Sequence, residues 1–236
     1  MRRSVRWGLG DAVLVFVVPV LVGLIASSFV IAATNLKADR HGHYPVTATL
    51  LLATIFGQYG VWVAYLAFTS ARKGLGTVRA DFGLVVDLVR DWPFFLMGFA
   101  LEIVAGIAVL PISNLVSHGP QSVVKDLQNA TGLTRALLVV TAVLIAPVVE
   151  ELFFRGLLLR AVQRRTSAAT AVTVSALAFA LVHPLLDPGF GSLVIVPALV
   201  ALGMVSGVLA VRSGNLSRSI LLHAGFNIVT VLVVVK

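Results

Sequence analysis

The sequence predicts an all-α protein, a polytopic transmembrane helical bundle of about seven spans. The chain of 236 residues is 58% hydrophobic and only 12% charged, whereas a soluble domain is about half apolar and about a quarter charged. Apolar stretches of about 20 residues alternate with short polar segments, which is typical of membrane-spanning helices. The sequence lacks the ~10-residue alternating segments that a membrane β-barrel requires.

The spans are predicted from the apolar runs and from the polar segments between them. The first run is longer than the roughly 7–15 apolar residues of a signal peptide, so we interpret it as a retained span. We expect residues 1–236 to form a single integral-membrane domain. The predicted spans cover residues 12–33, 46–69, 94–114, 135–160, 167–184, 190–212 and 216–235.

The distribution of Lys and Arg predicts the orientation of the bundle. The side of the membrane whose connections hold more of these residues is expected to be cytoplasmic, which places the N-terminus in the cytoplasm. Membrane topology thereby explains the net charge of +8, and no nucleic-acid partner is expected. The basic residues of the predicted cytoplasmic side are Arg2, Arg3, Arg6, Arg72, Lys73, Arg79, Arg90, Arg160, Arg164, Arg165, Arg212 and Arg218.

The connection at residues 79–92 mixes apolar and charged side chains and ends in Trp92. This pattern favours a short helix that lies in the membrane interface. An irregular loop is the alternative interpretation.

The stretch at residues 146–160, APVVEELFFRGLLLR, places three charged side chains inside the fourth predicted span. A charge at the centre of a span costs about 2.5–3.5 kcal/mol on insertion scales, so three of them indicate pairing or function. Glu151 and Arg155 are four residues apart on one helix face and can pair. Glu150 points about 100° away and needs another partner or a watery cavity.

Later spans supply polar side chains that can meet this stretch. His183 follows Phe179 by one helical turn, and His223 precedes Asn227 by one turn. Pro147 removes a backbone hydrogen bond and can kink the fourth span close to the two carboxylates. Because polar groups are costly at membrane depth, we expect them to converge on one cavity.

Each of these features also has a purely structural interpretation. Glu151 and Arg155 could form a clasp that serves packing. His183 lies close to the predicted outer end of its span and could meet the interface, and the histidine of the last span could hydrogen-bond across helices. Glu102, alone in the third span, either lines the cavity or forms a helix contact.

Three ordered motifs resemble those of the CPBP family of intramembrane proteases. They are Glu-Glu-x-x-x-Arg at 150–155, Phe-x-x-x-His at 179–183 and His-x-x-x-Asn at 223–227. This family, also called Abi, includes CAAX prenyl proteases and bacteriocin-processing proteins. The resemblance covers residues 146–227, the predicted protease-like core, and includes Gly156. The N-terminal half is similar to the family only in being hydrophobic and membrane-spanning.

The resemblance implies an intramembrane endopeptidase that hydrolyses peptide bonds of a membrane-associated or lipidated substrate. Glu150 is the expected catalytic glutamate, and His183 is its partner in holding the attacking water. The third motif would stabilise the oxyanion, and the second glutamate and the arginine of the first motif would support the site. The predicted catalytic residues are Glu150, Glu151, Arg155, His183, His223 and Asn227.

The cofactor requirement has two interpretations. The preferred one is a water molecule activated by glutamate with no metal, although the family is often named a metalloprotease family. The alternative is Zn held by Glu150, His183 and His223, a ligand set that leaves a position open for water. The sequence lacks H-E-x-x-H, which excludes a zincin-type helix, and it lacks cysteine, which excludes thiol catalysis and cysteine-ligated metal.

Two functions of other classes stay open at this point. One is a non-catalytic membrane scaffold or bacteriocin-immunity partner with the same fold, and the other is a small transporter whose buried Glu and His relay protons. The expected partners are membrane lipid and a peptide or membrane-protein substrate. The composition, rich in Ala, Val and Arg, favours a bacterial cell membrane.

Overall fold

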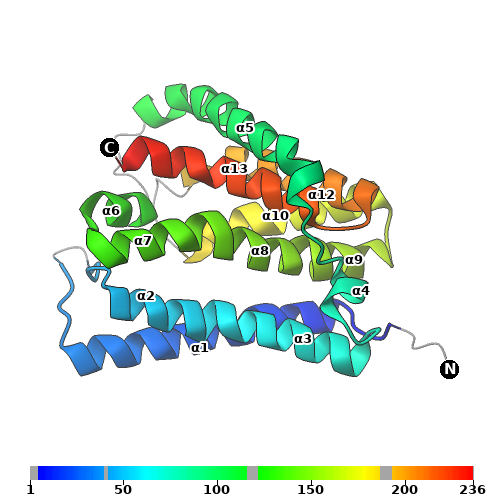
Figure 1. Ribbon diagram of the computed structural model, residues 1–236, viewed down its shortest axis with the longest axis horizontal. Helices are drawn as coiled ribbons and strands as arrows, with labels where there is room; N and C mark the ends of the chain where they lie inside the picture. Colours follow the sequence, from blue (N-terminus) through cyan, green and yellow to red (C-terminus); the bar gives the residue numbers. More distant parts are fainter. Residues whose placement is uncertain (1–4, 40–41, 116–121, 187–192, 236) are drawn as a thin grey trace.

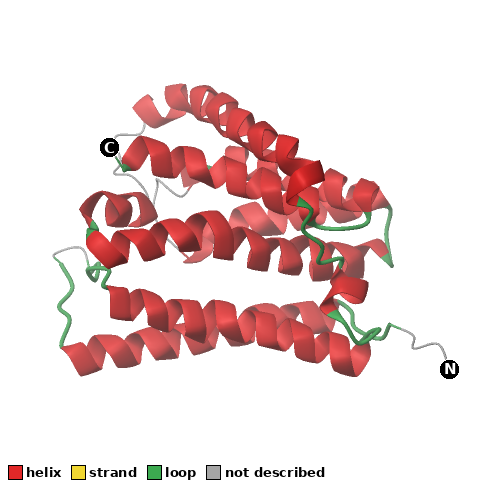
Figure 2. Cartoon of the chain, in the orientation of Figure 1, coloured by secondary structure: helices red, strands yellow, loops and turns green. Residues whose placement is uncertain are grey.

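The computed structural model is a bundle of helices that lie roughly along one axis (Figure 1). It describes residues 5–39, 42–115, 122–186 and 193–235, and these contain helices and no strand (Figure 2). Seven helical segments of the described chain are long and apolar enough to cross a membrane, which confirms the predicted all-α bundle of about seven spans. The segments are Leu9–Thr34, Ala48–Lys73, Leu88–Pro111, Gly132–Gln163, Ala168–Leu186, Val196–Ser213 and Ser217–Val234.

Several of these spans consist of more than one helical element, and short helices also form part of the connections. The N-terminal part contains α1 (Leu9–Thr34), α2 (Ala48–Thr54), η1 (Ile55–Gly60), α3 (Val61–Lys73), α4 (Val78–Phe82) and α5 (Leu88–Leu115). The C-terminal part contains α6 (Ser122–Asn129), α7 (Gly132–Val140), η2 (Thr141–Ile145), α8 (Ala146–Glu151), η3 (Leu152–Leu158), α9 (Leu159–Gln163), α10 (Ala168–Leu186), α12 (Val196–Ser213) and α13 (Ser217–Val234).

The fourth span is interrupted by two π-helical stretches, η2 and η3, on either side of the short helix α8. Pro147 gives a physical reason for the first of them, because it has no N–H to bond the carbonyl four residues earlier. Just before it, the Ala146 amide bonds the Thr141 carbonyl, five residues back. The helix therefore widens where the two carboxylates of α8 enter the bundle, a type of bulge that is frequent at functional sites.

The connections that were predicted to share one side of the membrane meet at one end of the bundle (Figure 1). Arg160 donates to the carbonyl oxygens of Asp81 and Gly214, at 3.1 and 2.9 Å. Arg164 Nη1 donates to the carbonyl oxygen of Trp7 at 2.6 Å. These bonds tie the N-terminal segment and two later connections to the end of the fourth span. Which membrane face this basic end occupies stays a prediction.

The segment at residues 79–92 forms neither a single interfacial helix nor an irregular loop. The segment begins within α4, which ends at Phe82. A short connection follows, and α5 begins at Leu88. Phe82 is fully buried in the bundle, and a Cβ added at Gly156 would lie 2.9 Å from the Phe82 Cβ. The short helix is thus anchored in the core by Phe82, and Gly156, the residue after the first motif, makes room for the Cβ and backbone of Phe82.

Helices α5 and α13 start at the same end of the bundle and run side by side (Figure 1). Two glycines allow their backbones to touch. A Cβ added at Gly98 would collide with the Leu222 carbonyl oxygen, and one added at Gly225 would collide with the Phe95 carbonyl oxygen. Small residues commonly permit such close approach between membrane helices. The crossing fixes the position of α5 relative to α13.

Candidate active site

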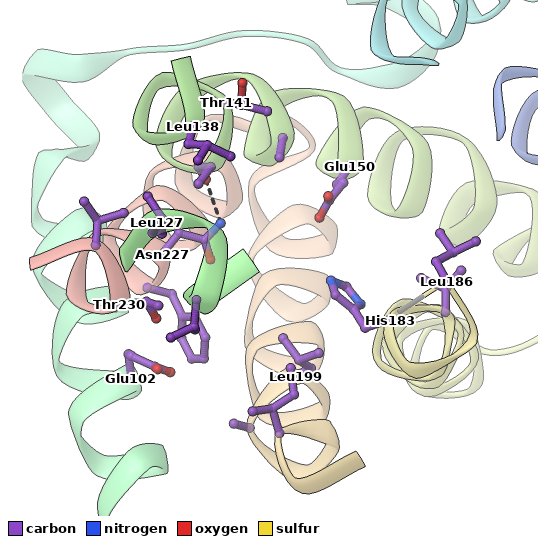
Figure 3. A pocket seen from close by; sticks show the side chains of 18 of the residues that line it. Glu102, Leu127, Leu138, Thr141, Glu150, His183, Leu186, Leu199, Asn227 and Thr230 are labelled. Carbon is purple, nitrogen blue, oxygen red and sulfur yellow. Dashed lines mark hydrogen bonds between the residues drawn. The ribbon is translucent and has the colours of Figure 1, made fainter. Parts of the chain in front are cut away.

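A cavity of about 590 Å³ lies inside the bundle, and all seven spans contribute to its wall. The wall is mostly apolar. Glu150 and His183 point into the space between their helices, with Glu102 and Asn227 on the other side of the cavity (Figure 3). The polar side chains that line the cavity are Gln58, Tyr59, Glu102, Thr141, Glu150, His183, Asn227 and Thr230.

Glu150 and His183 lie at similar depth in the bundle. Glu150 comes 13 residues before Gln163, the end of α9, and His183 comes 15 residues after Ala168, the start of α10. At 1.5 Å per residue, both are roughly 20 Å from the turn that joins the two helices. His183 therefore faces the cavity rather than the outer membrane interface.

The ring of His183 is held by its own helix. Its Nδ1 lies 2.7 Å from the carbonyl oxygen of Phe179, and the Phe179 ring packs edge-on against it at 4.9 Å. A carbonyl oxygen can only accept, so Nδ1 carries the hydrogen and Nε2 is the acceptor of the neutral ring. That acceptor can hold a water molecule by one of its O–H groups.

Glu151 and Arg155 form the pair that their spacing predicted, and both side chains are fully buried. Glu151 Oε1 accepts from Arg155 Nη1 at 2.9 Å and lies 3.1 Å from His223 Nδ1. The other end of the guanidinium donates to the Gly203 carbonyl oxygen at 3.2 Å and lies 4.6 Å from the centre of the Phe179 ring. We call Glu151, Arg155 and His223 the buried charge cluster; it ties the fourth span to α10, α12 and α13.

His223 connects this cluster to the cavity. An ionised carboxylate only accepts hydrogen bonds, so His223 Nδ1 donates to Glu151, and His223 Nε2 faces Glu150 Oε2 at 3.8 Å. The Glu150 side chain is 16% exposed, whereas that of Glu151 is 0% exposed. Adjacent glutamates thus have different environments, as their 100° separation on the helix predicted.

Asn227 reaches the cavity beside the first π-helical stretch, where its Nδ2 donates to the Ala142 carbonyl oxygen at 2.8 Å. That carbonyl would ordinarily accept from Ala146, but the Ala146 amide bonds Thr141 instead. Pro147, the next residue, has no N–H to offer. The irregular backbone therefore creates the acceptor that orients Asn227. The second N–H of its carboxamide is not used by this bond.

The cavity also has polar residues that were not predicted from the sequence. Gln58 and Tyr59 come from η1 in the second span, and Thr230 comes from α13. A signal for Thr230 existed, since it lies three residues after Asn227 on the same helix face. Glu102 lines the cavity, the first of its two predicted interpretations, and its carboxyl group lies next to the Thr230 side chain.

The alternative zinc site would use Glu150, His183 and His223. Within residues 5–39, 42–115, 122–186 and 193–235, no group of three His, Asp or Glu side chains lies close enough to hold one metal ion. Each histidine uses Nδ1 in a hydrogen bond and keeps Nε2 free, as zinc-binding histidines commonly do, so it is the spacing of the three side chains that does not suit a shared ion. As arranged, these residues do not fit the ion, and the reaction proposed below does not use it.

A family model matches the part of the chain that holds the three motifs. Residues 132–229 match the family described as type II CAAX prenyl endopeptidase Rce1-like. Neither a curated protein nor a solved structure matches the chain. The match begins at the fourth span and ends in α13, so it includes all the predicted catalytic residues. Residues 132–229 are thus similar to the Rce1-like family of type II CAAX prenyl endopeptidases, in agreement with the resemblance of the three motifs.

Proposed function

We propose that this protein is an integral-membrane endopeptidase in which Glu150 activates the attacking water. One observation carries the proposal: Glu150, His183 and Asn227, one residue from each motif, line the same cavity. The match of residues 132–229 to a family of endopeptidases supports it. The proposed catalytic set consists of the six polar residues of the three motifs.

The proposed reaction is hydrolysis by general base catalysis. Glu150 takes a proton from a water molecule that His183 Nε2 holds by its other hydrogen. The water oxygen bonds to the carbonyl carbon of the peptide, and the carbonyl oxygen becomes negatively charged. When the C–N bond breaks, the proton on Glu150 passes to the leaving nitrogen. One water is consumed, and one new carboxyl end and one new amino end are formed.

The negative oxygen of the intermediate needs donors. The second N–H of Asn227 is one candidate, and His223 Nε2 becomes another when the ring is protonated. Such donors each contribute about 3–4 kcal/mol in a dry, preorganised site. Glu151 and Arg155 act indirectly in this proposal, because they hold His223 in the orientation that faces Glu150.

The proposed substrate is a membrane-associated or lipidated peptide. The cavity lies within the spans and has a mostly apolar wall, which suits a lipid chain or a membrane-buried peptide segment. The family name points to prenylated CAAX ends as one such substrate. We also propose that the basic end of the bundle faces the cytoplasm, since Lys and Arg are enriched on that side of membrane proteins.

A comparison of membrane peptides in cells tests the proposal. Cells express the wild type, Glu150→Gln, or Asp87→Asn, which makes the same carboxyl-to-amide change on an exposed side chain outside the cavity. New peptide ends should accumulate with the wild type and with Asp87→Asn. They should be absent with Glu150→Gln at an equal level of protein in the membrane.

The same comparison with a chelator tests the metal-free reaction, which predicts no loss of the new ends. Loss with chelator, restored by zinc, would instead assign the activation of water to a metal. Full biological effect of Glu150→Gln would contradict the protease proposal and favour a non-catalytic scaffold.

A further inference from the structure

Glu102 differs from the other acidic side chains of the spans in its partners. Three of those acids have a Lys or Arg partner within 3.1 Å, and Glu150 has the imidazole of His223 at 3.8 Å. No ion pair is found for Glu102 in the part of the chain that the structure describes. The three pairs are Asp11–Lys73, Asp91–Arg218 and Glu151–Arg155.

The position of Glu102 is fixed by the glycine crossing of α5 and α13. Gly98 lies one turn before Glu102, and the contact of Gly98 with Leu222 sets the register of the two helices. Thr230 of α13 then lies next to the carboxyl group of Glu102. Its hydroxyl is neutral, so it does not compensate a negative charge on that acid. Both side chains line the cavity (Figure 3).

The cavity wall has an unusual balance of charged groups. Among the described residues it contains two carboxyl groups, from Glu102 and Glu150, one imidazole, from His183, and no Lys or Arg. A carboxylate in a low-dielectric surrounding attracts a cation much more strongly than it would in water. A positively charged group entering the cavity therefore gains at Glu102 an ion pair that the described part of the protein does not supply.

We propose that Glu102 and Thr230 form a subsite for an ammonium or guanidinium group of the substrate peptide. This inference rests on the proposed peptidase function, to which it adds a substrate preference. Glu102 lies across the cavity from Glu150 (Figure 3), so the cation is bound at a distance from the peptide bond that is cut. Because an extended peptide advances by about 3.3–3.6 Å per residue, the subsite selects a cation at one fixed position of the sequence.

A scan of peptide probes in nanodiscs tests this subsite. The probe is a quenched-fluorescent peptide with one farnesylated cysteine near its carboxyl end. Lysine is placed at each position in turn, and the matched control has norleucine, which keeps the four-carbon stem without the charge. The measured quantity is the ratio of kcat/KM for the lysine peptide to that for the norleucine peptide. A ratio measured with one protein does not depend on how much of that protein is folded.

The wild type should favour lysine by about tenfold or more at one position, the effect of one hydrogen bond to a charged group. In Glu102→Gln this ratio should fall to about one. Thr230→Val should reduce it by roughly threefold, the effect of one neutral hydrogen bond. Peptides with a free or an acetylated amino end distinguish a lysine side chain from an amino terminus as the bound cation.

A ratio of one at every position in the wild type, or an unchanged preference in Glu102→Gln, would overturn the subsite. These outcomes are separate from failure of the proposed function, which would show as cleavage of both peptides by Glu150→Gln. If the wild type cleaves none of the peptides, fluorescence anisotropy of the same probes measures binding. A lysine preference that disappears in Glu102→Gln then supports a cation subsite without proteolysis, and equal binding refutes it.

Discussion

The first three spans and the last four differ in how much of their surface lies inside the bundle. In the most apolar stretch of each span, 17% of the residues are buried for Leu9–Thr34 and 6% for Leu88–Pro111. The corresponding values are 50% for Gly132–Gln163 and 56% for Ser217–Val234. The buried spans hold the three motifs. Costly polar groups at membrane depth are thus concentrated where protein, rather than lipid, surrounds them.

The exposed spans are nevertheless part of the site. Phe16 of α1 and Trp62 of α3 both line the cavity, and their rings pack against Phe153 of the fourth span at 5.6 and 5.3 Å. Glu102 comes from the least buried span. The N-terminal spans therefore shape and close a cavity whose reactive groups come mainly from the C-terminal spans.

The largest expected effect on stability is that of removing a charge from the last four spans, the more buried half of the bundle. Arg155→Met leaves Glu151 buried beside His223 without its guanidinium, which should lower the free energy of unfolding by about 3–5 kcal/mol. The matched change in the exposed half is Lys73→Met, which breaks the more exposed pair with Asp11 and should cost less than about 1 kcal/mol. Unfolding by SDS in mixed micelles measures both values. Equal losses would contradict the contrast between the halves.

The second prediction concerns a point where the least buried span meets the most buried one. Gly98→Ala places a Cβ against the Leu222 carbonyl oxygen, so the helices must separate, at a cost of about 3 kcal/mol. Gly106→Ala on the same helix meets open space and should not destabilise, because Ala favours the helix over Gly. The same SDS titration compares them. If both variants kept wild-type stability, the close contact of α5 with α13 would be wrong.

A third prediction uses the same substitution in both halves. Phe179→Leu removes a fully buried ring that lies over the Arg155 guanidinium, and the loss should be about 2 kcal/mol. Phe29→Leu changes an exposed side chain of α1 and should alter stability by less than about 0.5 kcal/mol. Thermal unfolding in detergent provides the two midpoints. A larger shift for Phe29→Leu would mean that α1 has a packing partner on its exposed face.

The smallest effect on stability is expected at Trp62, where the first three spans pack against the last four. The buried Trp62 Nε1 has no hydrogen-bond partner among the described residues, so Trp62→Phe keeps an aromatic ring and removes an unsatisfied donor. The lost ring area and the removed donor oppose each other, and stability should change by less than about 1 kcal/mol. A loss of more than about 2 kcal/mol in the SDS titration would show that the indole N–H has a partner in the membrane.

The spans could be predicted closely because each is decided by local hydrophobicity. The last span, predicted at residues 216–235, is found at Ser217–Val234. The pairing of Glu151 with Arg155 was likewise predictable, since a spacing of four residues places both on one helix face. Such features depend on the chain immediately around them.

Features that depend on which helices are neighbours could not be predicted in this way. Nothing local to Gly98 indicates that a carbonyl of α13 lies against it, and Gln58 resembles any isolated polar residue of a span. Hydrophobic periodicity also assumes regular helices. It therefore did not predict the π-helical stretch beside Asn227 or the one that begins directly after the two glutamates. For the same reason, the segment at residues 79–92 could not be divided into its two helices.

The π-helical stretch η2 has a consequence for how such proteins diverge. Each residue of an α-helix turns the chain by about 100°, and a π-helical turn accommodates an additional residue. Deletion of a single residue between Thr141 and Ile145 would therefore restore a regular helix and leave the following side chains, including Glu150, at about the same rotation relative to α7. The carbonyl that now accepts from Asn227 would instead be bonded within the helix, so Asn227 would lose its acceptor. A homologue could thus lose the orientation of this carboxamide by one codon and still look, by hydropathy, like an intact enzyme.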